Sequence, residues 1–397
     1  MVGKAPFGPE ELTVVEGLGL FSPEYLDWLG TLHFTGAVRA VPEGTVVFAE
    51  EPILEVDAPM AEAQLAETFL LNQITLQTTL ATKAARCRQA AGGRAVVDFA
   101  LRRCQGIDAG MKLARICGLV GLTATSNVAG AGRYGVPASG TMAHAFVQAH
   151  DDELDAFRSF ASAFGDATVL LVDTYDTRRG IERAIRVAGE MRERGVELRG
   201  IRLDSGDLAA LADHARRRLD DAGFDDVQIF ASGGLDEHEV HRLLDVDHAP
   251  IDGFGLGSSL GVSADAPTLD TVYKLVSYDG RPVRKTSTGK ATWPGAKQVW
   301  RACDWSEDVV ALAEEPPPGV DYQPLLDTVM LDGRRTGAGC RQLPQAKEHF
   351  EQQWEELPQS LRRLTDPQRH PVCISAALRH TASEIDVHNE EERHGNV

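Results

Sequence analysis

Residues 200–207 read Gly-Ile-Arg-Leu-Asp-Ser-Gly-Asp, a short apolar run that ends in charged and glycine residues. The same order, an apolar run followed by a polar or Gly-rich cluster, recurs between residues 95 and 261. Short and almost continuously apolar runs are typical of buried parallel strands. We predict seven such strands, at residues 95–99, 122–126, 136–140, 168–173, 200–204, 227–231 and 253–257.

Amphipathic patterns with helical spacing lie between several of these runs, at residues 153–164, 178–194, 207–222 and 236–246. Buried parallel strands separated by crossover helices predict an α/β sheet that is covered on both faces. Because the polar clusters follow successive strands, the pattern favours a (β/α) barrel, whose functional residues gather at the carboxyl ends of its strands. The alternative is a doubly wound sheet, which concentrates such residues at one switch point.

The flanking regions differ in pattern. Residues 31–59 alternate β-like runs with turns, which predicts a small antiparallel sheet with strands at 33–41, 45–49 and 53–56. A helix is predicted from residue 60 to about 91, since no Pro or Gly interrupts it. From residue 271 onward the sequence again has β-like runs, at 273–278 and 281–286. A charged helix is predicted around 345–357.

Composition excludes several classes of partner. The 397 residues carry 40 Lys plus Arg against 59 Asp plus Glu, a formal net charge of −19. This balance argues against a nucleic acid or an anionic membrane as the main partner, although a local cluster of Arg can still bind a small anion. The six cysteines are scattered without metal-ligand spacing, so we expect free thiols and no structural metal. Without a signal peptide or a run of about 20 apolar residues, a cytoplasmic protein is expected.

Arg202 and Asp204 alternate with apolar neighbours and therefore share one face of their strand. A charged face inside a barrel is costly unless it lines a pocket. One interpretation has Arg202 binding a carboxylate, while Asp204 or Asp207 contacts a hydroxyl or a metal-bound pyrophosphate. The alternative is an ion pair at the barrel rim, with Asp207 capping the next helix.

Two Gly-rich clusters, at residues 232–234 and 255–258, follow the last two predicted strands. Glycine lets the backbone approach an anion closely, and barrels often hold phosphate at these loops. The two clusters together indicate a phosphate site, whereas each alone is better explained by a tight turn. Arg102 and Arg103 follow the first strand and either reach the same phosphate or form an ordinary surface pair.

Three further side chains are candidates. Asp173 and Asp176 follow the fourth strand and form a second pair of oxygen ligands, although Asp176 equally suits the cap of the helix that begins near residue 178. His144 follows a strand end directly after Gly140 and Thr141. A neutral histidine there is either a nucleophile toward a phosphoryl group, a general base, or a hydrogen-bonded structural residue.

Taken together, these motifs closely resemble the nicotinate phosphoribosyltransferase family, in order and with consistent spacing from about residue 20 to about 380. The motifs that carry the resemblance are 41–45 (Val-Pro-Glu-Gly-Thr), 125–128 (Thr-Ser-Asn-Val), 140–144 (Gly-Thr-Met-Ala-His), 172–177 (Val-Asp-Thr-Tyr-Asp-Thr), 201–207, 231–234 (Ala-Ser-Gly-Gly) and 290–301 (Lys-Ala-Thr-Trp-Pro-Gly-Ala-Lys-Gln-Val-Trp-Arg).

The resemblance implies an irregular α/β barrel flanked by a β-rich α+β domain built from both chain ends. We therefore expect boundaries at 1–94, 95–265 and 266–397. Such enzymes join nicotinate to 5-phosphoribosyl 1-diphosphate (PRPP), giving nicotinate mononucleotide and pyrophosphate in NAD salvage, with ATP hydrolysis coupled to the step. The implied small-molecule partners are nicotinate, PRPP, ATP and Mg²⁺, and the implied assembly is a homodimer.

By resemblance, His144 is phosphorylated by ATP, and Thr141 and Arg202 hold nicotinate. The catalytic set is then His144, Asp204 and Asp207, while Mg²⁺ arrives on the pyrophosphate near Asp173 and Asp204. The residues expected to bind PRPP or its phosphates are Arg102, Arg103, Ser205, Ser232, Gly233, Gly234, Gly257 and Ser258.

The sequence also departs from the family pattern. Members usually carry an Asp-Leu-Tyr-x-Leu-Thr-Met-like motif whose Tyr stacks on nicotinate, whereas Tyr25 lies in a different context and Ala100 stands where Gly is common. This departure motivates one alternative, a catalytically weak or regulatory homologue. A related phosphoribosyltransferase with another ring substrate is a second alternative.

Overall fold

The computed structural model describes residues 7–287 and 292–395 of the chain. The chain folds as two compact units, which are described separately. The first comprises residues Met1–Ile74 and Asp270–Val397, and the second comprises Thr75–Leu269. Helix α3 (Met60–Ala90) contributes residues to both. Two residues of the motif at 290–301, Lys290 and Ala291, lie outside the described part.

The second unit contains a six-stranded parallel sheet with the order β4-β3-β8-β7-β6-β5. Each strand pairs with a sequence neighbour, and the first strand also pairs with the last, Val96 opposite Phe254. This circular order is that of a barrel and has no switch point, which excludes the doubly wound alternative. The predicted α/β barrel is therefore confirmed as a curled sheet. Its strands are β3 (Ala95–Asp98), β4 (Ala124–Thr125), β5 (Val169–Leu171), β6 (Gly200–Leu203), β7 (Gln228–Ser232) and β8 (Gly253–Leu256).

The predicted strand at 136–140 is wrong, because that segment forms only one isolated bridge, between Ala138 and Thr125. Two backbone hydrogen bonds hold the segment. The N–H of Thr125 donates to the carbonyl of Pro137, and the N–H of Ser139 donates to the carbonyl of Thr125. Pro137 has no N–H and cannot extend the ladder. Among the described residues no strand pairing joins β4 to β5, so the ring of strands is open there.

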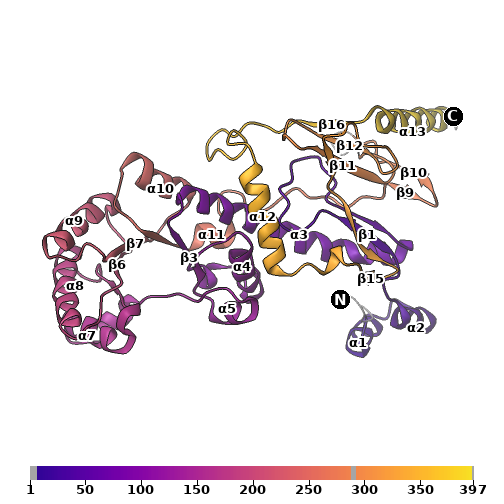
Figure 1. Ribbon diagram of the computed structural model, residues 1–397. Coiled ribbons are helices and arrows are strands. Elements are labelled where there is room, and N and C mark those ends of the chain that lie inside the picture. Colours follow the sequence, from indigo (N-terminus) through magenta and orange to yellow (C-terminus); the bar gives the residue numbers. More distant parts are fainter. Residues whose placement is uncertain (1–6, 288–291, 396–397) are drawn as a thin grey trace. The chain divides into compact units, whose positions relative to one another are not determined.

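Helices cover the outer side of this sheet, and Figure 1 shows α7, α8 and α9 side by side around β6 and β7. Side chains of Asp176 and Asp207 accept hydrogen bonds from the N–H groups of Arg179 and Ala210, so they cap α8 and α9. Their bounds, with the shorter helices of the unit, are α4 (Ile107–Leu119), α5 (Val128–Tyr134), α6 (His144–Gln148), α7 (Glu153–Phe164), α8 (Thr177–Arg192), α9 (Leu208–Asp221), α10 (Glu237–His241) and α11 (Ser258–Val262).

The predicted helix at 236–246 is divided, because α10 passes into a π-helical turn over Arg242–Val246. A π turn inserts one extra residue into the helical repeat and is often found at functional sites. Asp236 caps the N-terminus of α10 by accepting from two backbone N–H groups, of His238 and Glu239.

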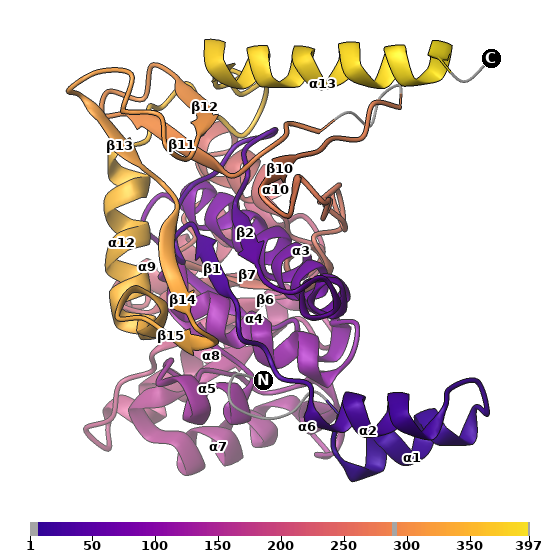
Figure 2. The ribbon, with the colours of Figure 1, turned by 90° about the vertical axis from the view of Figure 1, so that its right-hand side faces the viewer.

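The first unit joins both ends of the chain in one antiparallel sheet with the order β15-β14-β1-β2, in which Val38 of β1 pairs with Met330 of β14. Figure 2 shows β1 and β14 side by side. A second sheet has the order β13-β11-β12-β16. The strands are β1 (Ala37–Ala40), β2 (Leu54–Asp57), β9 (Ser277–Tyr278), β10 (Arg281–Pro282), β11 (Lys297–Ala302), β12 (Asp308–Leu312), β13 (Tyr322–Pro324), β14 (Asp327–Leu331), β15 (Arg334–Arg335) and β16 (Val372–Ile374), and the helices are α1 (Pro9–Gly17), α2 (Pro23–Thr31), α12 (Leu343–Glu356) and α13 (Ala376–Gly395).

One predicted strand of this unit, at 45–49, does not form. Its backbone bonds to side chains instead: Phe48 donates its N–H to Glu51, and the carbonyl of Val46 accepts from Arg301. The segment therefore has partners for these groups without joining a sheet.

Candidate active site

Arg202 points from β6 toward the carboxyl end of the sheet and is held there by three neighbours. Its Nη1 donates to Asp204 (3.2 Å) and to Ser232 at the end of β7 (3.1 Å), and its Nη2 donates to the carbonyl of Met142 (3.0 Å). Only 12 % of the side chain is exposed, and the guanidinium lies 5.7 Å from the centroid of the Phe99 ring. Contacts with the protein thus orient the side chain of the predicted carboxylate-binding residue.

Burial lowers the pKa of Arg202 below its ordinary value, against the opposite effects of Asp204 and Asp173. An arginine remains charged nonetheless, because its ordinary pKa lies far above neutrality. Its Nε is buried and has no hydrogen-bond partner among the described residues. The poorly solvated guanidinium has N–H capacity left for an anionic ligand.

His144 begins α6 and lies between two strand ends. Its Nδ1 is 3.2 Å from the hydroxyl of Thr174, and its Nε2 is 3.5 Å from Oδ2 of Asp204. The other oxygen of Asp204 accepts from Arg202 and from Ser232. One carboxylate therefore links the candidate phosphoryl acceptor to the candidate carboxylate-binding residue.

Asp173, just beyond β5, stabilises the loop after β6. Its Oδ2 accepts from the backbone N–H of Asp204 (3.2 Å) and from the hydroxyl of Ser205 (2.5 Å). Its Oδ1 is buried and has no partner among the described residues. An acceptor in this state suits an O–H, N–H or cation carried by a substrate.

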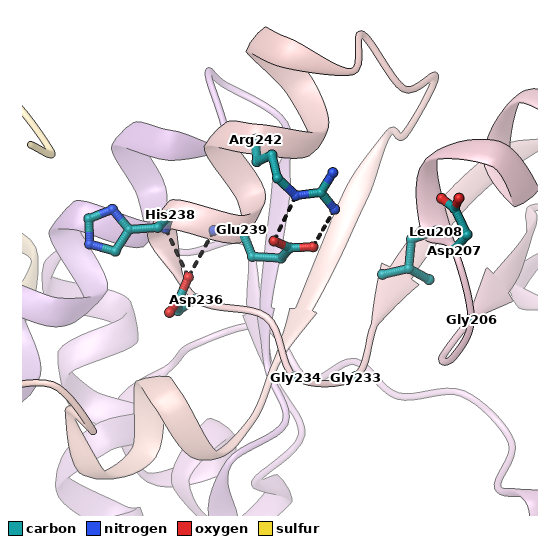
Figure 3. A pocket seen from close by; sticks show the side chains of 9 residues that line it. All are labelled: Gly206, Asp207, Leu208, Gly233, Gly234, Asp236, His238, Glu239 and Arg242. Carbon is teal, nitrogen blue, oxygen red and sulfur yellow. Dashed lines mark hydrogen bonds and ion pairs between the residues drawn. The ribbon is translucent and has the colours of Figure 1, made fainter.

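A pocket of about 670 Å³ lies beside this cluster, between the loops after β6 and β7. Figure 3 shows Asp207 and Leu208 on one side and α10 on the other, with Gly233 and Gly234 between them. The carboxylate of Glu239 is paired with Arg242 through two hydrogen bonds. The lining residues are Gly206, Asp207, Leu208, Gly233, Gly234, Asp236, His238, Glu239 and Arg242.

Gly233 is required by its backbone. Its φ of +91° disfavours a side chain, and a Cβ there would lie 2.0 Å from the carbonyl oxygen of Asp204. Gly255 on β8 leaves room for the ring of Phe99, which a Cβ would meet at 2.4 Å. The glycines thus let the strand-end loops approach one another closely.

The remaining predicted site residues are more scattered. Arg102 and Arg103 are exposed in a 3₁₀ turn (Leu101–Arg103) after β3, and the positive charge of Arg102 contributes to the lowered pKa of Arg202. Asp207 serves as the cap of α9 and also lines the pocket. The other three lie at separate loop positions: Thr141 beside Met142, and Gly257 and Ser258 at the start of α11, outside the pocket lining.

Sequence reasoning missed four contributors to the site. Thr174 contacts His144, Met142 contributes its carbonyl, and the ring of Phe99 lies near Arg202. The fourth is Asp98, which is 1 % exposed and accepts from Thr125 (2.6 Å), so that it joins the ends of β3 and β4. Burial raises the pKa of Asp98, although the bonds from Thr125 and Ala100 act the other way. Thr174 lies within the motif at 172–177, but the sequence pattern indicates a functional role only for the acidic residues of that motif.

Among the described residues, no group of three or more His, Cys, Asp or Glu is arranged to hold a metal ion. In the same part of the chain, no helix has the length and apolar character needed to cross a bilayer.

Family models for three successive regions match the chain. Residues 1–75 match the nicotinate phosphoribosyltransferase (NAPRTase) N-terminal domain, residues 95–292 match the NAPRTase family, and residues 318–382 match the nicotinate phosphoribosyltransferase C-terminal domain. The matched regions include every predicted site residue.

Individual relatives agree with these models. A nicotinate phosphoribosyltransferase of Mycobacterium tuberculosis is 48 % identical over 385 residues, covering 94 % of this chain and 82 % of that protein. A Bacillus subtilis nicotinate phosphoribosyltransferase is 46 % identical over 288 residues, covering 70 % of this chain and 58 % of that protein.

Two solved structures are similar over most of the fold. Human nicotinic acid phosphoribosyltransferase has a TM-score of 0.83 at 26 % identity, covering 96 % of this chain and 89 % of that one. A nicotinate-nucleotide pyrophosphorylase from Pyrococcus furiosus has a TM-score of 0.70 at 28 % identity, covering 84 % and 83 %.

Proposed function

The chain belongs to the nicotinate phosphoribosyltransferase family, and we propose that it joins nicotinate to PRPP, forming nicotinate mononucleotide and pyrophosphate in NAD salvage. The arrangement of Arg202 is the observation that carries this proposal. A buried guanidinium with an unpartnered Nε suits a small planar carboxylate, and a charge-assisted pair discriminates against the uncharged amide nicotinamide. The relatives favour neither a regulatory homologue nor another ring substrate, since they include a protein named for this activity at 48 % identity.

The side chains divide the reaction between them in this proposal. Arg202 and Thr141 bind nicotinate, and the loops that carry Gly233, Gly234, Gly257 and Ser258 bind the 5-phosphate of PRPP, with Arg102, Arg103, Ser205 and Ser232 near the phosphates. Departure of pyrophosphate leaves positive charge on the ribose C1, which a carboxylate near the ring stabilises. Asp204 takes this position, and Asp207 contacts the ribose or the leaving pyrophosphate.

When bound with the PRPP pyrophosphate, Mg²⁺ would supply positive charge that stabilises the leaving group. The residues present fit this role. The buried, unpartnered Oδ1 of Asp173 is an oxygen ligand of the kind that Mg²⁺ prefers, while Asp204 already accepts from two side chains. A single protein carboxylate suits an ion held mainly by substrate oxygens and water.

ATP hydrolysis is coupled to the step through His144, which accepts the γ-phosphoryl group. The approach of Asp204 to Nε2, at 3.5 Å, supports this role because a carboxylate there stabilises the charge that a substituted imidazole carries. We place the enzyme in the cytoplasm as a homodimer, in line with the sequence-based expectation.

The reaction is tested with purified protein, PRPP, Mg²⁺ and ATP, by measuring mononucleotide with nicotinate, nicotinamide or quinolinate as the ring substrate. Turnover with nicotinate alone is expected. Turnover with quinolinate instead would identify another phosphoribosyltransferase. No turnover with nicotinate while PRPP still binds would contradict the proposal and favour a regulatory homologue.

A further inference from the structure

Thr174 lies between Asp173 and the cap of α8, and its hydroxyl is 3.2 Å from Nδ1 of His144. The side chain is half-buried and belongs to none of the groups assigned above to a substrate. It is therefore a polar contact of the catalytic histidine that the proposed reaction does not yet use.

The two neighbours of the imidazole ring favour one tautomer. The carboxylate of Asp204 faces Nε2 at 3.5 Å, and a carboxylate can only accept a hydrogen bond. The neutral ring is favoured with its proton on Nε2, which leaves the lone pair on Nδ1. Because a hydroxyl can donate, the O–H of Thr174 points to that lone pair.

We propose that Thr174 is a catalytic residue in the phosphorylation of His144. Asp204, behind the ring, holds the tautomer in which Nδ1 is the nucleophile toward ATP, and the Thr174 hydroxyl beside Nδ1 donates to the phosphoryl group as it is transferred. The inference rests on the proposed phosphorylation of His144 and adds which nitrogen reacts and which side chain stabilises the transferred group.

The Nδ1 lone pair forms a bond to the γ-phosphorus of ATP, and the bond from that phosphorus to the β,γ-bridging oxygen breaks, so ADP leaves with that oxygen. Nε2 keeps its proton, and the positive ring faces the carboxylate of Asp204. The Thr174 hydroxyl, released from Nδ1, donates to an oxygen of the transferred phosphoryl group.

The test compares Thr174→Val, which keeps the shape and removes the hydroxyl, with Thr174→Ser, which restores it. Each variant is mixed with ATP labelled in the γ-phosphate, and the rate of His144 phosphorylation is measured across ATP concentrations. We expect Thr174→Val to slow the maximal rate by about 10- to 100-fold with the ATP KM little changed, since a donor to the transferred group stabilises the transition state and not bound ATP. Thr174→Ser should recover the rate to within about threefold, and Thr177→Val in the first turn of α8 is the matched control.

The possible results distinguish a failure of the role of Thr174 from a failure of the proposed phosphorylation of His144. A Thr174→Val variant that is phosphorylated at the wild-type rate would overturn the role of Thr174 alone. A slow Thr174→Ser variant would overturn it too, because the hydroxyl would not be the group that matters. Wild-type protein that incorporates no phosphate would overturn the inference together with the phosphorylation of His144.

Discussion

Nε2 of His144 lies 3.5 Å from Oδ2 of Asp204, and Oδ1 of the same carboxylate accepts from Arg202. The residue assigned to ATP and the residue assigned to nicotinate thus share one anionic neighbour. A change in the charge of His144 therefore alters its electrostatic interaction with Asp204. Through Asp204 it also affects the guanidinium that is proposed to bind nicotinate.

Replacing Arg202 by Lys tests the nicotinate site. Lysine keeps the charge but loses the planar pair of donors, so kcat/KM for nicotinate should fall by about 10- to 150-fold, the equivalent of about 1.5–3 kcal/mol for a charged hydrogen bond. Steady-state kinetics measure the change. Arg199→Lys, an exposed position directly before β6, is the control and should behave as wild type. Equal kinetics in the two variants would remove Arg202 from the nicotinate site.

Gly233→Ala tests the loop that is assigned to the phosphate of PRPP. A Cβ at φ +91° and 2.0 Å from the Asp204 carbonyl must shift the loop, which costs about 1–3 kcal/mol of stability. We expect a raised KM for PRPP and a lower unfolding temperature. Gly189→Ala, within α8 and with open space for a Cβ, should instead keep or slightly raise stability. If Gly233→Ala bound PRPP like the wild type, the loop would not contact the phosphate.

A buried ion-pair network stabilises the start of α10. Glu237 is 0 % exposed and pairs with Lys83 of α3 at 2.5 Å and with Arg86 at 2.8 Å. Burial alone would lower the pKa of Lys83, but the carboxylates of Asp265 and Glu237 outweigh it and raise the pKa. Removing Lys83 leaves Arg86 as the partner of one oxygen of Glu237, while the other buried oxygen loses its cation.

Lys83→Met should therefore destabilise the protein by about 1–3 kcal/mol in chemical denaturation. Lys112→Met, which removes an ion pair with the exposed Asp108, is the control and should change little. A Lys83→Met variant as stable as the Lys112→Met variant would show that the network contributes nothing to stability.

Glu51 makes the stability of the first unit depend on pH. Burial, together with Asp308, raises the pKa of Glu51 to about 9, while an unfolded glutamate titrates near 4.3. Between these values the unfolded chain loses a proton that the folded chain keeps, so this contribution is complete below about pH 4 and is lost as pH rises toward 9. The lowered pKa of Asp308 affects the stability of the first unit only at pH values below this range.

The unfolding temperature should fall as the pH is raised from 5 to 9. In Glu51→Gln this dependence on pH should be weaker. Its exposed neighbour offers the control, since Glu50→Gln should retain the wild-type slope. A Glu51→Gln protein with the wild-type slope would contradict the assignment.

Much of the barrel could be predicted from the sequence because its strands are continuous apolar runs and its helices begin at capping residues. Asp176 and Asp207 are caps, as one interpretation of each had it. The failure of the segment at 136–140 to form a strand could not be predicted. Pro137 lacks the N–H that would extend the pairing, and this matters only where the neighbouring strand lies beside it. The link from Thr174 to His144 was equally hidden, because two loops distant in sequence meet only when parallel strands align their carboxyl ends.

The central claim is that these strand ends form a nicotinate phosphoribosyltransferase site whose ATP coupling runs through His144. The most direct measurement follows ADP and nicotinate mononucleotide together in wild-type protein and in His144→Ala, with His241→Ala, an exposed position of α10, as the control. We expect the wild type and the control to form mononucleotide from nicotinate faster when ATP is present. His144→Ala should lose both ADP formation and the stimulation by ATP while its thermal unfolding stays unchanged. A His144→Ala protein that still hydrolyses ATP and responds to it like the wild type would contradict the account.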